Sequence, residues 1–590
     1  EDAKDIDPLQ HDLFYSPFVK QKDEFGYITE DDIKVIFEPI LIFCLVWSFG
    51  SVLNEASRPK FDQFLKEKMK NNQSSCQFPS LNTVYDYFFD LSSRHWAEWT
   101  DGKTGIEITE EKPIEQILVP TNETASMIFY SRLLIHNSHH VLFHGPESSK
   151  SLVIKTLCEN ILDKSYDCRN LPFANCSTAS NVLKVFRSFL HKSHGSFGPL
   201  MNQHLVIFID NIGSVKPEIY GAQPPLELIR QFFDYGGWYN TANVEFQNIV
   251  GTTIIAAMGP PGAGLFTIPD RLLRHFNFIH IPKFKEETLE IIVKSLLKLK
   301  LNEHVESVRE MIQNTTEACL SIYQSCLQHL LPIPSKLHYI FSLRNIIRVI
   351  KGMLLVEPKE VKDEEQFVRL WYHEMMREFN DRFNQDQDRN WFEQTLKKTI
   401  KTKFNITTDF EPPKFNDFAD RSGSYKECNM NDSDILKVCN DVLEDHNREA
   451  AKPLDIVLFQ EAVDHLSAMS RILAMTRGHA LLVGVKSSGR KSLARLSLHM
   501  ASMEIFEIQI TRTYNMNEWR EDMKNLMKQC GSNDLPTGFV ISDVQIVGSF
   551  QLEDISNLMI NGEIPNLFER DEMEQIKADI IQNELLTDED

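Results

Sequence analysis

The chain has 590 residues, of which 42% are hydrophobic and 25% charged, and its formal net charge is -22. This length predicts three or four folded units with sizeable cores. The negative charge argues against nucleic acid or an acidic membrane as a partner, because clustered Lys and Arg bind phosphates. The 10 cysteines include no CxxC pair, which favours a reducing, cytosolic compartment.

The N-terminal region predicts helices. Apolar residues recur at helical spacing through residues 31–70, which end in the charged run KFDQFLKEKMK. The most apolar stretch, residues 39–53, is shorter than the roughly 20 residues that cross a bilayer. We therefore expect a buried helix within a helical lid. The chain begins with Glu1 and shows no signal peptide, which is typical of a piece of a longer protein.

Strands and helices alternate after residue 140. Short apolar runs between helices indicate a parallel sheet that is covered on both faces, and thus a three-layer α/β unit. The expected strands are residues 141–145, 171–174, 204–210 and 248–258, and the expected helices start at Ser151 and span residues 180–192.

The pattern changes twice in the rest of the chain. Residues 285–404 are predicted to be helical, and the polar, proline-containing segment 409–425 is the best linker candidate. The α/β order then restarts with a helix at 457–473, a strand at 479–485, a helix at 491–501 and strands at 504–510 and 537–543. This order predicts a tandem repeat of one fold.

Each repeat contains a variant of the phosphate-binding turn GxxxxGK(S/T). In that turn backbone N–H groups and the lysine hold phosphates, and the hydroxyl binds magnesium. The first candidate keeps the lysine and the serine, but it is one residue short and lacks the second glycine. It reads Gly145-Pro146-Glu147-Ser148-Ser149-Lys150-Ser151.

The changes in the first turn should weaken phosphate binding. A side chain at Ser149 opposes a positive φ by roughly 1 kcal/mol. Glu147 would bring a carboxylate close to the phosphate oxygens, which is a repulsive contact. The alternative is a strand-to-helix corner that only packs.

The second turn has the full length but different cations. It reads Gly484-Val485-Lys486-Ser487-Ser488-Gly489-Arg490-Lys491-Ser492. Arg490 stands at the lysine position, and its planar guanidinium cannot replace a lysine's point charge without a shift of the loop. Lys491 displaces the magnesium hydroxyl unless Ser492 substitutes. For this second turn, weak residual binding of nucleotide and no binding of nucleotide both remain possible.

The acidic residues at the strand ends also differ from the pattern that ATP hydrolysis needs. Hydrolysis of Mg-ATP needs one carboxylate near the metal and another that orients the attacking water. Asp210 ends the run VIFID and could hold Mg²⁺ together with Ser151, but Asn211 follows it. In the second repeat Asp543 is followed by Val544 and Gln545. Neither repeat supplies the second carboxylate.

The chain closely resembles the dynein heavy chain of axonemes over nearly its whole length. The most specific stretches are PEIYGAQPPLELIRQFFDYGGWYN, IIAAMGPPGAG, DRLLRHFNFI, LLPIPSKLHYIFSLRNIIRVIKG, RLWYHEMMREFNDRF and EDISNLMINGEIPNLF. The resemblance implies tandem AAA+ modules of P-loop NTPase type with helical lids. The implied parts are the end of the second module with its lid (1–70), the α/β subdomain of the third (71–284), its lid and following helices (285–408), a linker (409–425) and the truncated α/β subdomain of the fourth (426–590).

The resemblance also implies roles for three arginines. Arg344 matches the lid arginine that approaches the terminal phosphate of the nucleotide. Arg271 and Arg274 match the arginines that the third module turns toward the site of the second. They could instead be surface charges at a helix start. The matching arginines of the fourth module would lie beyond Asp590, so turnover by this piece should be negligible.

The implied function is that of a motor-ring segment. The parent chain would be an ATP-driven, minus-end-directed microtubule motor of the cytoplasm and the ciliary axoneme. Its partners would be the rest of the ring, microtubules through the stalk, and intermediate and light chains through the tail. Bound ATP or ADP with Mg²⁺ would be weak or absent and regulatory or structural. The alternatives are a non-hydrolysing scaffold and a free-standing AAA+ remodelling enzyme, which predicts intact turns and paired carboxylates.

Overall fold

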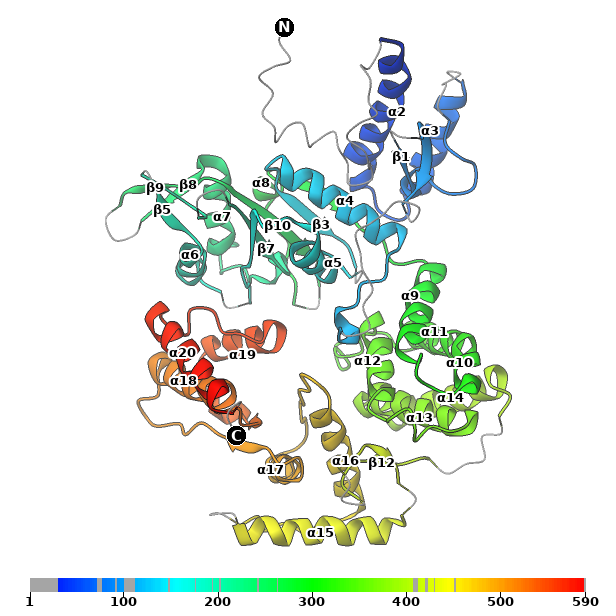
Figure 1. Cartoon of the computed structure of the whole chain (residues 1–590), viewed down its shortest axis with the longest axis vertical. Helices are drawn as coiled ribbons and strands as arrows, with labels where there is room; N and C mark the ends of the chain where they lie inside the picture. The colour runs from blue at the N-terminus through cyan, green and yellow to red at the C-terminus, as the bar shows by residue number, and fades with distance from the viewer. Residues whose placement is uncertain are drawn as a thin grey trace. The chain divides into compact units, whose positions relative to one another are not determined.

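The computed structural model describes residues 30–71, 77–90, 93–99, 112–146, 149–175, 177–193, 195–200, 203–240, 244–262, 264–406, 412–419, 423–428, 430–449 and 453–587. For residues 30–35, 449, 570 and 582–587 it describes the backbone only. The chain divides into two compact units, residues 1–289 and 290–590, and each is described by itself (Figure 1).

The first unit opens with two helices and a hairpin. These are α2 (Glu30–Phe49), α3 (Arg58–Asn71), β1 (Tyr87–Asp90) and β2 (His95–Glu98). The helices confirm the prediction for residues 31–70. For residues 39–53 the predicted helix is present, but its predicted burial is only partly correct. One face of α2 packs through rings such as Trp47, whose centroid lies 4.2 Å from that of Tyr130. Leu41 and Phe49 on the other face are 48% and 67% exposed.

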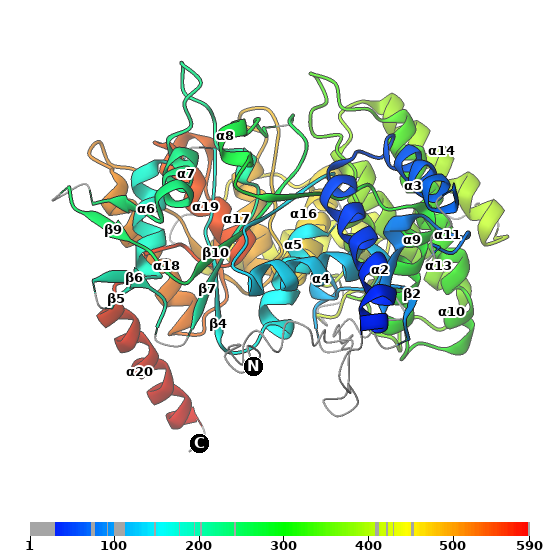
Figure 2. The ribbon, with the colours of Figure 1, turned by 90° about the horizontal axis from the view of Figure 1, so that it is seen from above.

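A parallel sheet forms the centre of the first unit. Among the described residues it has five strands in the order β11-β3-β10-β7-β4. The neighbouring strands β10, β7 and β4 are labelled in Figure 2. The strands are β3 (Val141–His144), β4 (Tyr166–Asn170), β7 (His204–Ile209), β10 (Thr252–Met258) and β11 (Asn277–His280). Every neighbouring pair is parallel.

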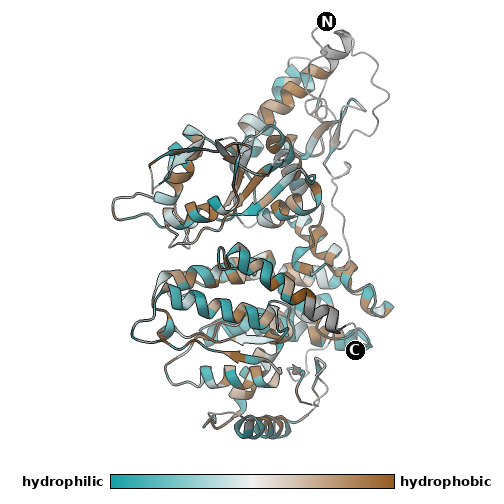
Figure 3. Cartoon of the chain, turned by 60° about the vertical axis from the view of Figure 1, so that its left-hand side comes forward, coloured by the Kyte–Doolittle hydropathy of each residue, from teal (hydrophilic) through white to brown (hydrophobic). Residues whose placement is uncertain are grey.

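Two hydrophobic layers cover this sheet, because successive side chains of a strand point to opposite faces. Leu142 and Ile207 face the layer of α6 (Ala179–Ser188) and α7 (Pro224–Tyr235). Phe143 and Val206 face the layer of α4 (Asn122–His136) and α5 (Lys150–Thr156). In Figure 3 the strands of the sheet are largely brown, the colour of hydrophobic residues. The predicted three-layer unit is confirmed.

Smaller elements complete the first unit. A π-helical turn (Leu157–Ile161) continues α5, and α8 (Asp270–Leu273) precedes β11. The short strands are β5 (His191–Ser193), β6 (Ser196–Gly198), β8 (Gly237–Tyr239) and β9 (Phe246–Asn248). The helix predicted at 180–192 thus ends early, and the strand predicted at 171–174 was wrong. The actual strand β4 is a mostly polar edge strand, so its sequence lacks an apolar run.

The second unit begins with helices, as predicted for residues 285–404. They are α9 (Glu286–Lys300), which starts in the first unit, α10 (Glu306–Glu310), α11 (Ile312–His329), α12 (Leu343–Met353), α13 (Glu364–Phe379) and α14 (Asp386–Lys403). In the predicted linker, β12 (Phe415–Asn416) pairs with β13 (Lys426–Glu427), and Tyr425 is buried. Part of that segment is therefore packed.

The remaining elements follow this pair. They are α15 (Asp432–Glu449), α16 (Gln460–Ala474), α17 (Arg490–Met500), β14 (Glu504–Phe506), α18 (Met516–Gly531), β15 (Thr537–Phe539), α19 (Ser549–Asn561) and α20 (Arg570–Thr587). The predicted helices at 457–473 and 491–501 are confirmed. None of the described helices is both long enough and apolar enough to cross a membrane.

The strand predicted at 479–485 was wrong. This segment forms no strand in the described structure, and Leu481 and Val483 are 89% and 85% exposed. In the first unit β3 pairs on both sides, with β10 and β11, which come far later in the chain. Here β14 and β15 pair only with each other, and both are shorter than predicted. An apolar run becomes a strand only where partner strands bind it.

Candidate functional site

The first turn joins β3 to α5 at one edge of the parallel sheet. Gly145 has φ +150°, and a Cβ atom there would lie 2.0 Å from the backbone oxygen of Ile281, which follows β11. The backbone N–H of Gly145 donates to the oxygen of Met258 at 3.2 Å. Glycine at this position is therefore a steric requirement of the strand-to-helix corner, whatever the turn binds.

Lys150 is turned back onto its own loop. Its Nζ donates to the backbone oxygens of Gly145 at 2.8 Å and of Pro146 at 2.5 Å. In a phosphate-binding turn this ammonium reaches phosphate oxygens. Nucleotide phosphates would therefore have to displace two carbonyl groups. The predicted repulsion from Glu147 concerns a residue outside the described part of the chain.

Ser149 adopts the conformation that the sequence indicated to be unfavourable. It is the N-cap of α5, and its φ of +55° places it in the left-handed region. The second turn has Gly489 at the corresponding N-cap of α17, with φ +75°. The two turns thus impose the same backbone demand, but only the second meets it with glycine.

This difference gives a testable prediction. Ser149→Gly should stabilise the start of α5 by about 0.5–1 kcal/mol, because glycine carries no Cβ penalty at positive φ. The amide of Val153 donates to the oxygen of Ser149 at 2.9 Å, so its hydrogen exchange should slow by about two- to fivefold. Gly489→Ala should destabilise α17 by a similar amount. If the Val153 amide exchanged at the same rate in Ser149→Gly and in the control Ser149→Ala, this result would contradict backbone strain at position 149.

Asp210 reaches the same edge of the sheet as Lys150 and Ser151. It follows the last residue of β7, and β7 and β3 flank β10 in parallel. Carboxyl ends of parallel strands meet at one edge, where open α/β sheets bind ligands. Asn211 comes next with φ +53° and caps a short 3-10 turn. The sequence supplies an amide there instead of a second carboxylate.

Arg271 and Arg274 lie at the opposite edge of the sheet. They belong to α8 and its C-cap, just before β11 begins beside the start of β3. Arg271 pairs with Glu227 at 2.7 Å and Arg274 with Asp234 at 2.9 Å, both carboxylates of α7. The two guanidinium groups are 61% and 62% exposed. The structure therefore separates both arginines from Lys150.

In the described structure no strand precedes the second turn, and Lys491 is engaged in an ion pair. The Nζ of Lys491 pairs with Glu507 at 2.9 Å, and Arg495 binds the same carboxylate through two hydrogen bonds of 2.7 and 2.8 Å. These cations hold the pKa of Glu507 below its usual value, the Arg495 hydrogen bond being the largest cause. Lys491 thus serves a structural ion pair in this structure.

Of the other candidates in the second unit, Arg490 and Ser492 are half-buried, whereas Asp543 and Arg344 are exposed. Arg490 is the first residue of α17, and Ser492 stands two residues later. Asp543 is exposed at the start of a 3-10 turn, beyond the end of β15. Arg344, the second residue of α12, is also exposed.

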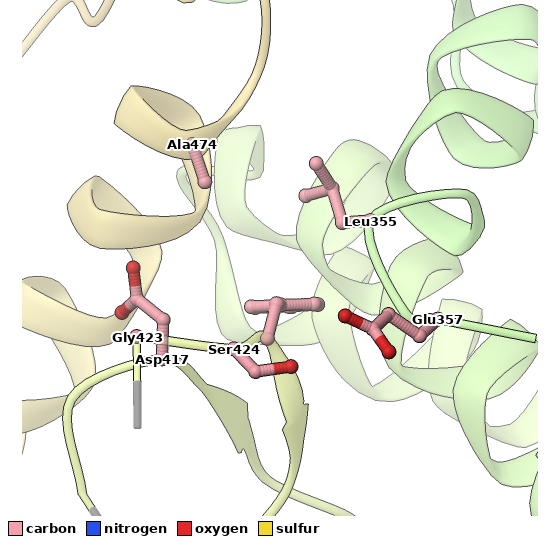
Figure 4. Close-up of a pocket in the computed structure, with 7 residues that line it drawn as sticks. Leu355, Glu357, Asp417, Gly423, Ser424 and Ala474 are labelled. Carbon is pink, nitrogen blue, oxygen red and sulfur yellow. The ribbon is translucent and has the colours of Figure 1, made fainter. Parts of the chain in front are cut away.

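A cavity of about 370 Å³ lies in the second unit, away from its phosphate turn (Figure 4). Glu357 and Asp417 stand on opposite sides of it, and Tyr425 forms part of its lining. The hydroxyl of Ser470 donates to Asp417. The lining residues that the structure describes include no lysine or arginine.

No pattern in the sequence indicated the buried charge cluster beside this cavity. Glu374 of α13 accepts a hydrogen bond of 2.8 Å from Nε of Arg471 in α16, and one of 3.2 Å from the hydroxyl of Tyr425. The partners of Glu374 lie far away in sequence, so no local spacing predicts them.

Four family models match the chain. Residues 12–101 match one described as dynein heavy chain AAA lid domain, and residues 106–284 one described as P-loop containing dynein motor region. Residues 292–389 match a dynein heavy chain ATPase lid domain, and residues 454–588 a P-loop containing dynein motor region D4.

Curated relatives match over most of the chain. Dynein axonemal heavy chain 1 of Homo sapiens is 34% identical over 603 aligned residues, which cover 96% of this chain and 14% of the relative. Dynein axonemal heavy chain 6 of Homo sapiens is 32% identical over 93% of this chain and 14% of its own length. The Dynein-1-beta heavy chain, flagellar inner arm I1 complex, of Chlamydomonas reinhardtii is 32% identical over 91% of this chain and 12% of its own. The chain thus spans a small part of these proteins.

Proposed function

Because this chain belongs to the dynein heavy chain family and corresponds to a segment of the motor region, we propose that it transmits conformational change within an axonemal motor ring. It would supply the end of the second AAA+ module (1–70), the third (71–284 and 285–408), a linker (409–425) and the first part of the fourth (426–590). The whole protein would drive ATP-dependent, minus-end-directed movement along microtubules in cilia or flagella.

The partners of the whole protein follow from the same proposal. The rest of the heavy chain would complete the ring. Microtubules would bind through the stalk, and intermediate and light chains through the tail, both outside this segment. The location would be the cytoplasm and the axonemal cytoskeleton of the cilium.

We propose that the turn at Gly145 binds ATP or ADP weakly and does not hydrolyse it. The supporting observation is the position of Lys150, whose ammonium is already held by two loop carbonyls. On binding, Lys150 would leave these carbonyls for phosphate, and Ser151 with Asp210 would hold Mg²⁺. Asn211 cannot accept a proton from an attacking water. Nucleotide would therefore regulate the ring at this position without turnover.

The second turn would bind nucleotide even more weakly than the first. Lys491 is paired with Glu507, and no strand precedes the turn in the described structure. Residual phosphate binding there would depend on Gly484, Gly489 and Arg490, and any metal contact on Ser492 and Asp543. In the complete ring Arg344 would approach the nucleotide of the third module.

Arg271 and Arg274 would act on the second module's site. Their exposure and their place at the opposite edge from Lys150 support a role toward a neighbouring module. Glu227 and Asp234 would hold them ready, and exposed ion pairs of this kind cost little to break. The alternative role is a surface network that fixes α8 on α7.

Calorimetric titration of the 590-residue chain with ATP and ADP tests the regulatory proposal. We expect Mg²⁺-dependent binding in the micromolar range, no measurable hydrolysis, and loss of most binding in Lys150→Met. The matched control is Lys155→Met, on the same helix but outside the turn. Absence of binding at millimolar nucleotide would favour the scaffold. Turnover that disappears in Lys150→Met would refute the degenerate site, and binding unaffected by Lys150→Met would refute this turn as the site.

A further inference from the structure

Cys158 and Cys168 lie side by side on two elements next to the phosphate turn. Cys158 is in the π-helical turn that continues α5, and Cys168 is on β4. These two elements are in contact, and the two thiols are close enough to influence each other's pKa. Both cysteines are half-buried and unbridged, and both pack on the core beneath α4 and α5.

We propose that Cys158 and Cys168 form a redox-sensitive thiol pair that hydrogen peroxide converts to a disulfide between the end of the phosphate-turn helix and the edge strand of the sheet. The two thiols lie on contacting elements and pack against the same hydrophobic cluster, and among the described residues β4 pairs with β7 alone. Peroxide therefore meets the pair at the margin of the fold, where a small oxidant can enter.

The surroundings assign different roles to the two sulfur atoms. The nearby Cys158 is the largest influence on Cys168 and lowers its pKa, whereas burial and Asp167 oppose this shift and Arg169 supports it. The same contact, together with burial, raises the pKa of Cys158. The thiolate is the reactive form of cysteine, and low-pKa thiols beside a second cysteine are typical of redox sensors. Cys168 is therefore the nucleophile and Cys158 the resolving thiol.

The reaction has two balanced steps. The Cys168 thiolate attacks one oxygen of hydrogen peroxide, the O–O bond breaks, and the leaving hydroxide takes a proton to form water. The sulfur is then a sulfenic acid. Cys158 loses its proton and attacks that sulfur, the S–O bond breaks, and a second water leaves as the S–S bond forms. The two thiols together lose two electrons and two protons, which peroxide accepts.

The backbone at Cys158 is a second sign of specialisation. α5 is regular from Lys150 to Thr156 and then widens into the π-helical turn Leu157–Ile161. Such insertions in helices occur frequently at functional sites. Because α5 begins at Lys150, a disulfide at its far end would fix the helix that presents the phosphate-turn lysine.

Peptide mapping of the whole chain tests the pair. The reduced chain is exposed to hydrogen peroxide, its remaining thiols are alkylated, and trypsin releases residues 156–164 and 165–169. We expect these two peptides to become disulfide-linked before Cys319 and Cys326 change, since both of those are buried and burial raises their pKa to about 12. Recovery of both peptides in alkylated form would overturn the proposal, and so would pairing of either thiol mainly with another cysteine.

Two serine variants separate the roles. In Cys158→Ser the sulfenic acid of Cys168 cannot be resolved and should be trapped by dimedone. In Cys168→Ser the remaining thiol should react no faster with peroxide than the exposed Cys530. Equal dimedone labelling of the two variants would contradict the assignment of nucleophile and resolving thiol. Because the wild-type mapping needs no substitution, misfolding of a variant does not decide the outcome.

Discussion

Replacement of Arg471 by methionine should destabilise the helices around Glu374 by about 3–5 kcal/mol, since it leaves a buried carboxylate without its cation. The side chains of Glu374 and Arg471 are 0% and 6% exposed, and both Nε and Nη2 of the arginine bind the same oxygen, Oε2. Burial raises the pKa of Glu374, and the guanidinium opposes that shift. Hydrogen exchange of α13 and α16 amides would measure the loss.

Two further variants separate the buried pair from simple loss of charge. Arg448→Met is the matched control, because its pairs with Glu444 and Asp445 are largely exposed, and it should change stability by less than about 0.5 kcal/mol. The double variant Glu374→Leu with Arg471→Met should recover much of the stability, because it removes both buried charges. If Arg471→Met and Arg448→Met reduced the folding stability equally, the buried ion pair would contribute no more to stability than an exposed one.

The pair also explains a glycine in the neighbouring helix. A Cβ atom on Gly352 of α12 would lie 1.7 Å from Oε2 of Glu374 and 2.7 Å from Nη2 of Arg471. The ion pair thus occupies the space that a side chain on α12 would fill. Three helices, α12, α13 and α16, meet at this point, and a change in any of them must move the charges.

The sequence predicted the sheet of the first unit well because the signals for its buried strands are local. Each buried strand is a short apolar run, and the parallel order places Asp210 at the edge where Lys150 stands. The partners of Lys150 were not predictable, because they are carbonyl oxygens of its own loop and depend on its exact curvature. The sequence indicated strain at Ser149, but only the structure shows that the residue adopts the positive φ.

The errors arise where structure depends on distant residues. Residues 479–485 are as apolar as β3, yet they form no strand in the described structure, because a strand needs neighbours that the local sequence does not reveal. Glu374 looked like an ordinary helical residue, and its cation Arg471 is 97 positions away. Helical spacing correctly placed α2, but it could not show that one apolar face stays exposed.

Lowering the pH from 7 to 5 should destabilise the first unit by about 2 kcal/mol through His140. Burial, followed by the nearby His275, His139 and His204, lowers the pKa of His140 from 6.5 to about 4. Its Nδ1 accepts a hydrogen bond of 3.0 Å from the N–H of Ile254, and its ring packs at a tilt against Phe233, with 4.2 Å between the centroids. A proton on Nδ1 would break this bond to β10.

The sign follows from which state binds more protons. Between pH 6.5 and about 4 the unfolded chain holds a proton on His140 that the folded chain excludes, so stability is complete above that window and falls as the pH decreases through it. Urea denaturation at pH 7 and pH 5 would measure the difference. His140→Asn keeps an acceptor for Ile254 but does not titrate, so between pH 7 and pH 5 its stability should fall by about 2 kcal/mol less than that of the unmodified chain. His95→Asn, at an exposed position of β2, should behave like the unmodified chain. An equal fall in His140→Asn and the unmodified chain would assign the acid sensitivity to other groups, foremost His280, whose pKa burial also lowers to about 4.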